Sequence, residues 1–315
     1  MKPPVIVLAG PTAVGKTSLS LRLAKALDAE IISADSMQVY RGMNIGTAKI
    51  PAEERAGIPH HLIDVADPSE DFSIARYVRL GREVIRDLDT RGKVPLVVGG
   101  TGFYIQALLK DLDFSEEKKE GTLREEYRLL AETEGTKALH DRLAAVDPVS
   151  AEAIHPNNIK RVIRALEYFE ESGQPISALN EAQTGQESPY RILYLVLNLP
   201  RQELYCRIDR RVDQMMEEGL LEETKQLLQA GIPAKATALQ SIGYKELTEY
   251  LRGTCSLDEA VNQIKLHSRH YAKRQITWFK REPDAVWIEK SDYAAEEELL
   301  MALLERCRSF LHERQ

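Results

Sequence analysis

A phosphate-binding pattern near the start of the chain restricts the fold more than any other feature. Residues 10–17 read Gly-Pro-Thr-Ala-Val-Gly-Lys-Thr, which matches G-x-x-x-x-G-K-[ST]. An apolar run at residues 5–9 predicts a buried strand before it, and residues 16–28 predict an amphipathic helix after it. This succession predicts a P-loop, whose backbone N–H groups surround phosphate oxygens at a helix N-terminus. The predicted pyrophosphate-binding residues are Gly10, Pro11, Thr12, Ala13, Val14, Gly15, Lys16 and Thr17.

The two polar residues at the end of the pattern indicate a cofactor. Lys16 can place a positive charge on the phosphates, and the Thr17 hydroxyl can ligate Mg²⁺. Mg²⁺ is therefore the expected cofactor. The pattern does not select the ligand, because ATP, GTP and prenyl pyrophosphates all carry a diphosphate.

The alternation of predicted elements indicates an α/β fold with a parallel sheet. Strands are predicted at 30–34 and 94–98, and helices at 73–90 and 102–109. Residues 111–190 are polar and helix-prone, and 191–199 then predict a returning strand. Long helices follow at 201–230 and 257–281, the second with a Ser256–Glu259 capping box. We therefore expect an α/β core made of residues 1–113 and 191–315, and a helical insertion domain at 114–190.

A carboxylate follows the second predicted strand. Asp35 should face the same end of the sheet as the P-loop, where it could accept a proton or orient Mg²⁺-bound water. It could equally cap a turn. The third strand ends at Gly99-Gly100-Thr101-Gly102, without the acidic residue expected of an ordinary P-loop ATPase. That difference leaves small kinases open, and the Thr101 hydroxyl is available to a ligand.

Basic residues cluster on predicted helices although the formal net charge is −7. Residues 260–281 hold Lys and Arg side chains without Asp or Glu, and 272–281 interleave them with Trp278 and Phe279, a composition that suits RNA. Either aromatic could instead lie in the core. A second basic helix, at 158–169, carries Lys160, Arg161 and Arg164 opposite the apolar residues Ile159, Val162, Ile163 and Leu166. These basic residues could contact an anionic partner or form an ordinary solvated helix face.

Arginines also cluster on the helix after the returning strand. Arg207, Arg210 and Arg211 lie about one turn apart, and arginine suits bidentate phosphate contacts. Asp209 and Asp213 could instead pair with them. The three cysteines show neither zinc spacing nor a disulfide framework, which favours a reducing, cytoplasmic setting. No apolar run reaches the roughly 18 residues that cross a bilayer.

Taken together, the motifs resemble the tRNA dimethylallyltransferase family, also called tRNA isopentenyltransferases, in its short bacterial form. The 35–49 block is far more specific than the P-loop. The segments that carry the resemblance follow the family order and span nearly the whole chain: residues 10–17, 35–49, 97–104, 155–167, 241–245 and 272–278.

The resemblance implies an activity and a fold. The activity is transfer of a dimethylallyl group from dimethylallyl pyrophosphate to N6 of the adenosine 3′-adjacent to the anticodon, in tRNAs that read codons beginning with U. The fold is a nucleoside-kinase-like P-loop core whose helical insertion binds the anticodon stem-loop. A monomer is expected. Two alternatives from other classes stay open: an ATP-dependent kinase for a small molecule or nucleotide, and a non-catalytic RNA-binding module.

The resemblance also implies roles for single residues. Asp35 would be the base, Thr101 would hold the attacking group, and Lys16 and Arg211 would stabilise the leaving pyrophosphate. Thr17 and Asp35 would bind the metal ion. The implied tRNA-binding residues are Asp35, Ser36, Met37, Gln38, Thr101, Lys160, Arg161, Arg164 and Arg274.

Overall fold

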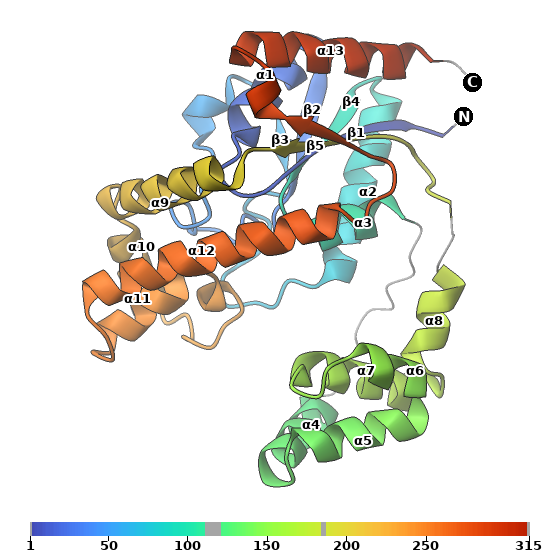
Figure 1. Cartoon of the computed structure of the whole chain (residues 1–315), viewed down its shortest axis with the longest axis vertical. Coiled ribbons are helices and arrows are strands. Elements are labelled where there is room, and N and C mark those ends of the chain that lie inside the picture. Colours follow the sequence, from blue (N-terminus) through green and yellow to red (C-terminus); the bar gives the residue numbers. More distant parts are fainter. Residues whose placement is uncertain (1, 111–120, 184–186, 314–315) are drawn as a thin grey trace. The chain divides into compact units, whose positions relative to one another are not determined.

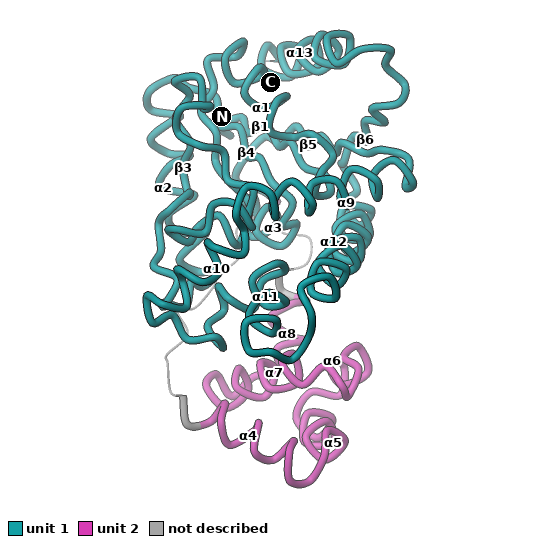
Figure 2. The backbone as a smooth tube through the Cα atoms, turned by 90° about the vertical axis from the view of Figure 1, so that its left-hand side faces the viewer, with its two compact units in different colours: residues 1–110, 188–315 teal, residues 111–187 magenta. Residues whose placement is uncertain are grey.

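The computed structural model describes residues 2–110, 121–183 and 187–313. Contacts divide the chain into two compact units (Figure 2). Unit 1 comprises residues 1–110 and 188–315, and unit 2 comprises residues 111–187. The expected boundary at 113/114 lies outside the described residues, whereas the expected return to the core at 191 is the first residue of strand β5.

Among the described residues of unit 1, six strands form one parallel sheet in the order β3-β2-β4-β1-β5-β6. The central strand β1 is almost fully buried because both its edges and both its faces are covered. The parallel α/β fold is confirmed. The strands are β1 (Pro4–Ala9), β2 (Ala29–Ala34), β3 (His60–His61), β4 (Val94–Gly99), β5 (Arg191–Asn198) and β6 (Ala285–Glu289).

Helices cover both faces of this sheet (Figure 1). Helix α1 packs on β1, β2 and β4 and is itself covered by α13, while α2 and α3 pack together against β2 and β4. These helices are α1 (Lys16–Leu27), α2 (Ile74–Thr90), α3 (Gly102–Leu109) and α13 (Glu296–His312).

The remaining helices of unit 1 follow strand β5. The expected single helix at 201–230 is wrong, because Gly219 adopts φ +102° and separates two helices there. The helix expected at 257–281 ends at Phe279, and its Ser256–Glu259 capping box is confirmed. These helices are α9 (Arg201–Glu217), α10 (Leu220–Gln229), α11 (Tyr244–Leu251) and α12 (Leu257–Phe279), with the short 3₁₀ turns η2 (Ala238–Gln240) and η3 (Lys290–Asp292). A further 3₁₀ turn, η1 (Ala52–Arg55), lies between β2 and β3.

Unit 2 has a hydrophobic core of its own, formed by the inner faces of its helices. The predicted apolar face of the basic helix is confirmed: Val162, Ile163 and Leu166 are buried and Ile159 packs against them. An ion pair from Arg124 to the buried Glu167 fixes the first of these helices on the basic one. The described helices of unit 2 are α4 (Gly121–Thr133), α5 (Thr136–Val146), α6 (Pro148–Ala153), α7 (Ile159–Ser172) and α8 (Ile176–Gln183).

Candidate active site

The P-loop connects the end of β1 to the start of α1. Its two glycines are required by backbone conformation, since Gly10 has φ +147° and Gly15, the N-cap of α1, has φ +92°. A Cβ on Gly10 would also lie 2.6 Å from the Leu197 carbonyl oxygen. The Lys16 Nζ donates hydrogen bonds of 2.8 Å to the carbonyl oxygens of Gly10 and Pro11. The ammonium group is therefore held within the loop.

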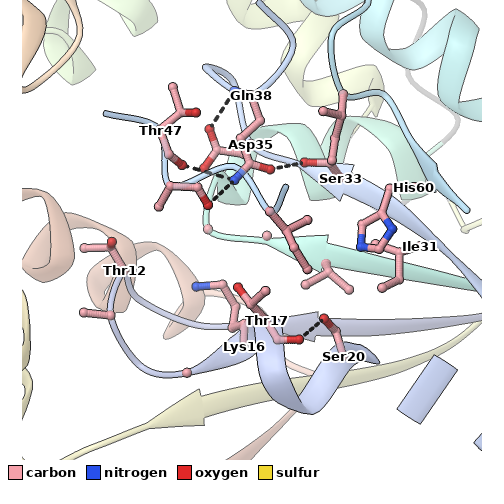
Figure 3. Close-up of a pocket in the computed structure, with 18 of the residues that line it drawn as sticks. Thr12, Lys16, Thr17, Ser20, Ile31, Ser33, Asp35, Gln38, Thr47 and His60 are labelled. Carbon is pink, nitrogen blue, oxygen red and sulfur yellow. Dashed lines mark hydrogen bonds between the residues drawn. The ribbon is translucent and has the colours of Figure 1, made fainter. Parts of the chain in front are cut away.

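A cavity of about 140 Å³ opens beside this loop. Figure 3 shows Lys16 and Thr17 on one side of it and Asp35 and Gln38 on the other. The wall also includes an apolar section, which a phosphate alone would not need. That section consists of Ile31, Ala48, Ile50, Ile63 and Val98.

Asp35 lies in the cavity wall, and its carboxylate also caps a turn. Oδ1 accepts hydrogen bonds from the backbone amides of Met37, at 2.9 Å, and Gln38, at 3.3 Å. The capping role left open by the sequence is thus present together with the cavity position. Because these two amides fix the orientation of the carboxylate, the group is preorganised beside the P-loop.

Arg211, from α9, reaches the same cavity. The alternative pairing of this arginine with its helix neighbours is wrong, because Asp209 and Asp213 form ion pairs with Arg269 and Lys265 of α12. Those pairs join α9 to α12. Two basic side chains of the 260–281 segment, Lys265 and Arg269, are therefore engaged in packing between helices. Lys273, Arg274, Lys280 and Arg281 of the same segment are exposed.

Burial and neighbouring charges shift the proton equilibria of the cavity residues. Burial lowers the pKa of Lys16 to about 7, with a further lowering by Arg211 and an opposing effect of Asp35. Burial also lowers the pKa of Arg211, and Asp35 opposes that shift too. Burial and the charge of Asp35 raise the pKa of Tyr271 to about 12, so its phenol stays protonated at neutral pH. An anionic ligand would relieve the crowding of the two cations.

Of the other residues expected to bind the tRNA in this region, some line the cavity and some do not. Gln38 lines it, whereas Thr101 is not part of the described cavity wall. The Thr101 Oγ1 instead accepts a hydrogen bond of 3.2 Å from the Ser36 amide, which ties the start of α3 to the turn after Asp35. Ser36 and Met37 contribute the backbone of that turn and are partly exposed.

Two cavity residues from α12 were missed by the sequence reasoning. Tyr271 and Gln275 line the cavity from one face of the helix. Gln275 is only 5% exposed, and its Nε2 donates to the Gly100 carbonyl oxygen at 2.9 Å. A Cβ on Gly100 would lie 2.1 Å from that Nε2, which explains the glycine. The segment 272–278, which includes Gln275, is one of those that carry the family resemblance. No motif or residue spacing in the sequence marks a glutamine on a basic helix as a cavity residue.

The basic residues expected to contact RNA lie in both units. Lys160 and Arg161 are exposed on α7 of unit 2, and Arg164 on the same helix is partly buried. Arg274 is exposed on α12 of unit 1, with its guanidinium 5.7 Å from the centroid of the Tyr271 ring. Of the two aromatics nearby, Phe279 is fully buried in the core and Trp278 is partly exposed.

The donor groups at the cavity suit Mg²⁺. Within the described residues no group of three His, Cys, Asp or Glu side chains could form a protein-only metal cage. Thr17 and Asp35 nevertheless both line the cavity, and Mg²⁺ is commonly held by one or two such oxygen ligands together with phosphate oxygens and water. The residues therefore fit a Mg²⁺ ion that is shared with a bound pyrophosphate.

The parallel α/β fold, the P-loop lysine and the carboxylate across one cavity define a P-loop transferase. The family model described as IPP transferase matches residues 38–282, and that described as isopentenyl transferase matches residues 3–64. The chain belongs to this family of isopentenyl transferases. In the residues that the structure describes, no helix is both long and apolar enough to cross a bilayer.

Individual relatives agree with this assignment. The chain is 53% identical over 301 residues to the tRNA dimethylallyltransferase of Lachnoclostridium phytofermentans, with 96% of each chain covered. It is 50% identical to the Bacillus subtilis enzyme of that name, with 91% of each covered. The solved tRNA isopentenylpyrophosphate transferase from Bacillus halodurans is similar, with a TM-score of 0.74, 44% identity, and coverage of 99% of this chain and 98% of that one. A eukaryotic dimethylallyltransferase acting on tRNA gives a TM-score of 0.85 at 32% identity, covering 99% of this chain and 80% of that one.

Proposed function

We propose that this chain transfers a dimethylallyl group from dimethylallyl pyrophosphate to N6 of the adenosine 3′-adjacent to the anticodon, in tRNAs that read codons beginning with U. Among the structural observations, one carries the proposal: Lys16, Asp35 and Arg211 line one cavity that also has an apolar wall. The polar part suits a pyrophosphate and the apolar part suits a C5 tail. The enzyme acts in the cytoplasm, where its tRNA substrates are made, and as a monomer.

The donor pyrophosphate binds at the P-loop. Backbone N–H groups at the N-terminus of α1 contact its oxygens, and Lys16 and Arg211 supply positive charge. Mg²⁺, which Thr17 and Asp35 would hold, would supply further charge neutralisation for the leaving group. The apolar residues of the wall exclude water from the allylic carbon.

In the transfer step, N6 of the adenine attacks the allylic carbon. The new C–N bond forms as the C–O bond to pyrophosphate breaks, and the electron pair of that bond stays on the leaving oxygen. The N6 proton passes to the Asp35 carboxylate, whose orientation its turn amides fix. Thr101 helps to position the attacking group through the 35–38 turn. Because both reactants are held in place, alignment can contribute about 7–11 kcal/mol in favourable cases.

The tRNA contacts both units of the chain. The adenine has to leave its stack to reach the cavity, as in other enzymes that modify bases. Gln38, Ser36, Met37 and Arg274 contact it. Gln38 lines the cavity, Ser36 and Met37 lie in the turn after Asp35, and Arg274 is exposed on α12. In unit 2, Lys160, Arg161 and Arg164 of α7 contact phosphates of the anticodon stem-loop.

One experiment tests the proposal. Unmodified tRNA is incubated with the protein, Mg²⁺ and dimethylallyl pyrophosphate without any nucleotide, and the digested RNA is examined by mass spectrometry. We expect N6-isopentenyladenosine at the position 3′ of the anticodon. Product formation that requires ATP, or phosphorylation of a small acceptor at a comparable rate, would support the kinase alternative. Binding of tRNA without any product would support the non-catalytic RNA-binding module.

A further inference from the structure

One buried carboxylate organises a loop of the cavity wall from outside the cavity. Glu223, on α10, accepts hydrogen bonds from three consecutive backbone amides. The amides belong to Asn44 and Ile45, each 2.9 Å from Oε2, and to Gly46, 3.2 Å from Oε1. Consecutive N–H groups that converge in this way form an anion-binding nest, here filled by a side chain of the same chain.

The surroundings of Glu223 show that this arrangement is specific. The residue is 9% exposed, and the Tyr244 hydroxyl donates to its Oε1 at 2.5 Å. A Cβ on Gly46 would lie 2.5 Å from the Tyr244 ring, so the glycine permits the close approach. Burying a carboxylate is costly unless hydrogen bonds compensate for the lost water. The four donors supply that compensation, and they leave the loop little freedom.

The same loop contacts a side chain in the cavity. The carbonyl oxygens of Thr47 and Ala48 lie 3.2 and 3.5 Å from the Gln38 Nε2, which donates to them. The Gln38 Oε1 accepts from the Ser33 hydroxyl at 3.0 Å (Figure 3). These partners decide which way the amide faces, and Gln38, Thr47 and Ala48 all line the cavity together with Asp35.

We infer that Glu223 is a positioning residue for the transfer reaction, which acts through the loop 43–49 to hold the Gln38 amide beside Asp35. This inference rests on the proposed function, because it assigns Gln38 a role toward the adenine acceptor. Glu223 itself touches no substrate. Its effect should therefore depend on Gln38 and should be seen in the rate of transfer more than in donor affinity.

A double-mutant cycle tests that dependence. The variants are Glu223→Gln, which puts amide hydrogens among the backbone donors, Gln38→Ala, and the pair together. In single-turnover transfer we expect Glu223→Gln to lower the maximal rate about tenfold with less than about a threefold change in KM for dimethylallyl pyrophosphate. In the Gln38→Ala background the same change should cost less than about twofold. Additive losses would overturn the inference, since they would mean that Glu223 acts independently of Gln38.

A matched control separates positioning from general stability. Glu246 is also a buried carboxylate that accepts a backbone amide, that of Gly243 at 2.8 Å, but it caps α11 and does not hold the loop. We expect Glu246→Gln to lower the thermal stability while the maximal rate stays within about twofold of the wild type. If Glu223→Gln does not fold, Tyr244→Phe removes one hydrogen bond from the same carboxylate and should show the same dependence on Gln38.

Hydrogen exchange provides a readout that needs no catalysis. In the wild-type protein the amides of Asn44, Ile45 and Gly46 should be protected, and Glu223→Gln should expose these amides selectively. Unchanged protection would overturn the inference even if transfer is slowed. A wild-type protein without transfer activity would instead refute the proposed function and with it the assigned role, whereas an active wild type with an additive cycle refutes the positioning role alone.

Discussion

Gln275 accepts a hydrogen bond of 2.9 Å from the backbone amide of Thr12, a P-loop residue that lies 263 positions earlier in the chain. The Nε2 of the Gln275 side chain donates to the Gly100 carbonyl oxygen, directly after the end of β4. A single side chain of α12 thus fixes the P-loop relative to the glycine turn that follows the adjacent strand. Both of its partners are backbone groups, which have few other means of hydrogen bonding once buried.

Replacing this glutamine should weaken donor binding. Gln275→Leu keeps a similar volume but leaves the Thr12 amide and the Gly100 carbonyl without their partner. The cost is about 1–3 kcal/mol for the buried carbonyl and less for the partly buried amide. We expect KM for dimethylallyl pyrophosphate to rise by about tenfold and the melting temperature to fall. Steady-state kinetics and thermal unfolding measure the two effects. Gln214→Leu, at an exposed glutamine of α9 whose Nε2 donates to its neighbour Glu218 at 2.7 Å, is the control and should leave both values unchanged.

Removal of the charge on Asp35 should separate chemistry from binding. In Asp35→Asn the side-chain oxygen can still accept the amides of Met37 and Gln38, so the turn is kept while the base is lost. We expect the transfer rate to fall by about 10²–10⁴ while tRNA affinity changes only a few-fold. Single-turnover assays and filter binding provide the two numbers.

The control for that experiment is another turn-capping aspartate. Asp67 Oδ1 accepts the Ser69 amide at 2.9 Å in a similar local arrangement, and Asp67 is not among the residues of the cavity wall. Asp67→Asn should therefore leave turnover intact. An Asp35→Asn variant with near wild-type turnover would exclude the role of Asp35 as a base.

The sequence was sufficient to predict the P-loop and the parallel sheet with its strands β1, β2, β4 and β5, because these depend on local patterns. The two-residue strand β3 and the edge strand β6 were not predicted. A glycine-rich loop between a strand and a helix, and apolar strands of five or six residues, are visible in short windows. The same local reasoning failed at Gly219. A glycine within a helical pattern is often tolerated, so the sequence alone did not show that Gly219 adopts φ +102° and separates α9 from α10.

The cavity was predictable only in part, since its walls come from residues far apart in the chain. Asp35 and Arg211 were recognised as candidates, but the ion pairs of Asp209 and Asp213 with α12 could not be read from α9 alone. Gln275 and Glu223 were missed for a related reason. Each accepts hydrogen bonds from the backbone of a loop far away in the chain. Such contacts produce no recognisable residue spacing in the sequence. Even the basic segment was ambiguous, because Lys265 and Arg269 serve packing.

The basic face of α7 should contribute to tRNA affinity through phosphate contacts. Changing Lys160, Arg161 and Arg164 together to Ala should weaken binding and flatten its dependence on salt. Each lost phosphate contact should reduce the slope of log K against log salt by about 0.7–0.9. Binding titrations between low and physiological salt measure this slope.

Arg207 provides the comparison for the triple variant. It is exposed on α9, where it pairs with Glu203 at 2.9 Å, and no RNA contact is assigned to it. Arg207→Ala should therefore keep the wild-type slope. If the triple variant kept that slope as well, the basic residues of α7 would be an ordinary solvated helix face.

Pyrophosphate binding should depend on pH through Lys16. The pKa of this lysine is lowered to about 7, by burial first and by Arg211 second, so the free protein loses the proton as the pH rises through neutrality. The ammonium form is the one that attracts an anion. Affinity for inorganic pyrophosphate should therefore be greatest below about pH 7 and should fall by up to about tenfold for each pH unit above it, with one proton taken up on binding.

Calorimetry in two buffers of different ionisation enthalpy counts that proton. At about pH 8 the wild-type protein should take up nearly one proton more than Lys16→Met, because the bound anion restores the ammonium form. The titration of pyrophosphate itself is common to both proteins and cancels in the difference. Lys25→Met, at an exposed lysine in the last turn of the same helix α1, should behave as the wild type. Equal proton uptake by the wild type and Lys16→Met would mean that Lys16 is already charged in the free protein, and the burial of its ammonium group would then not control donor binding.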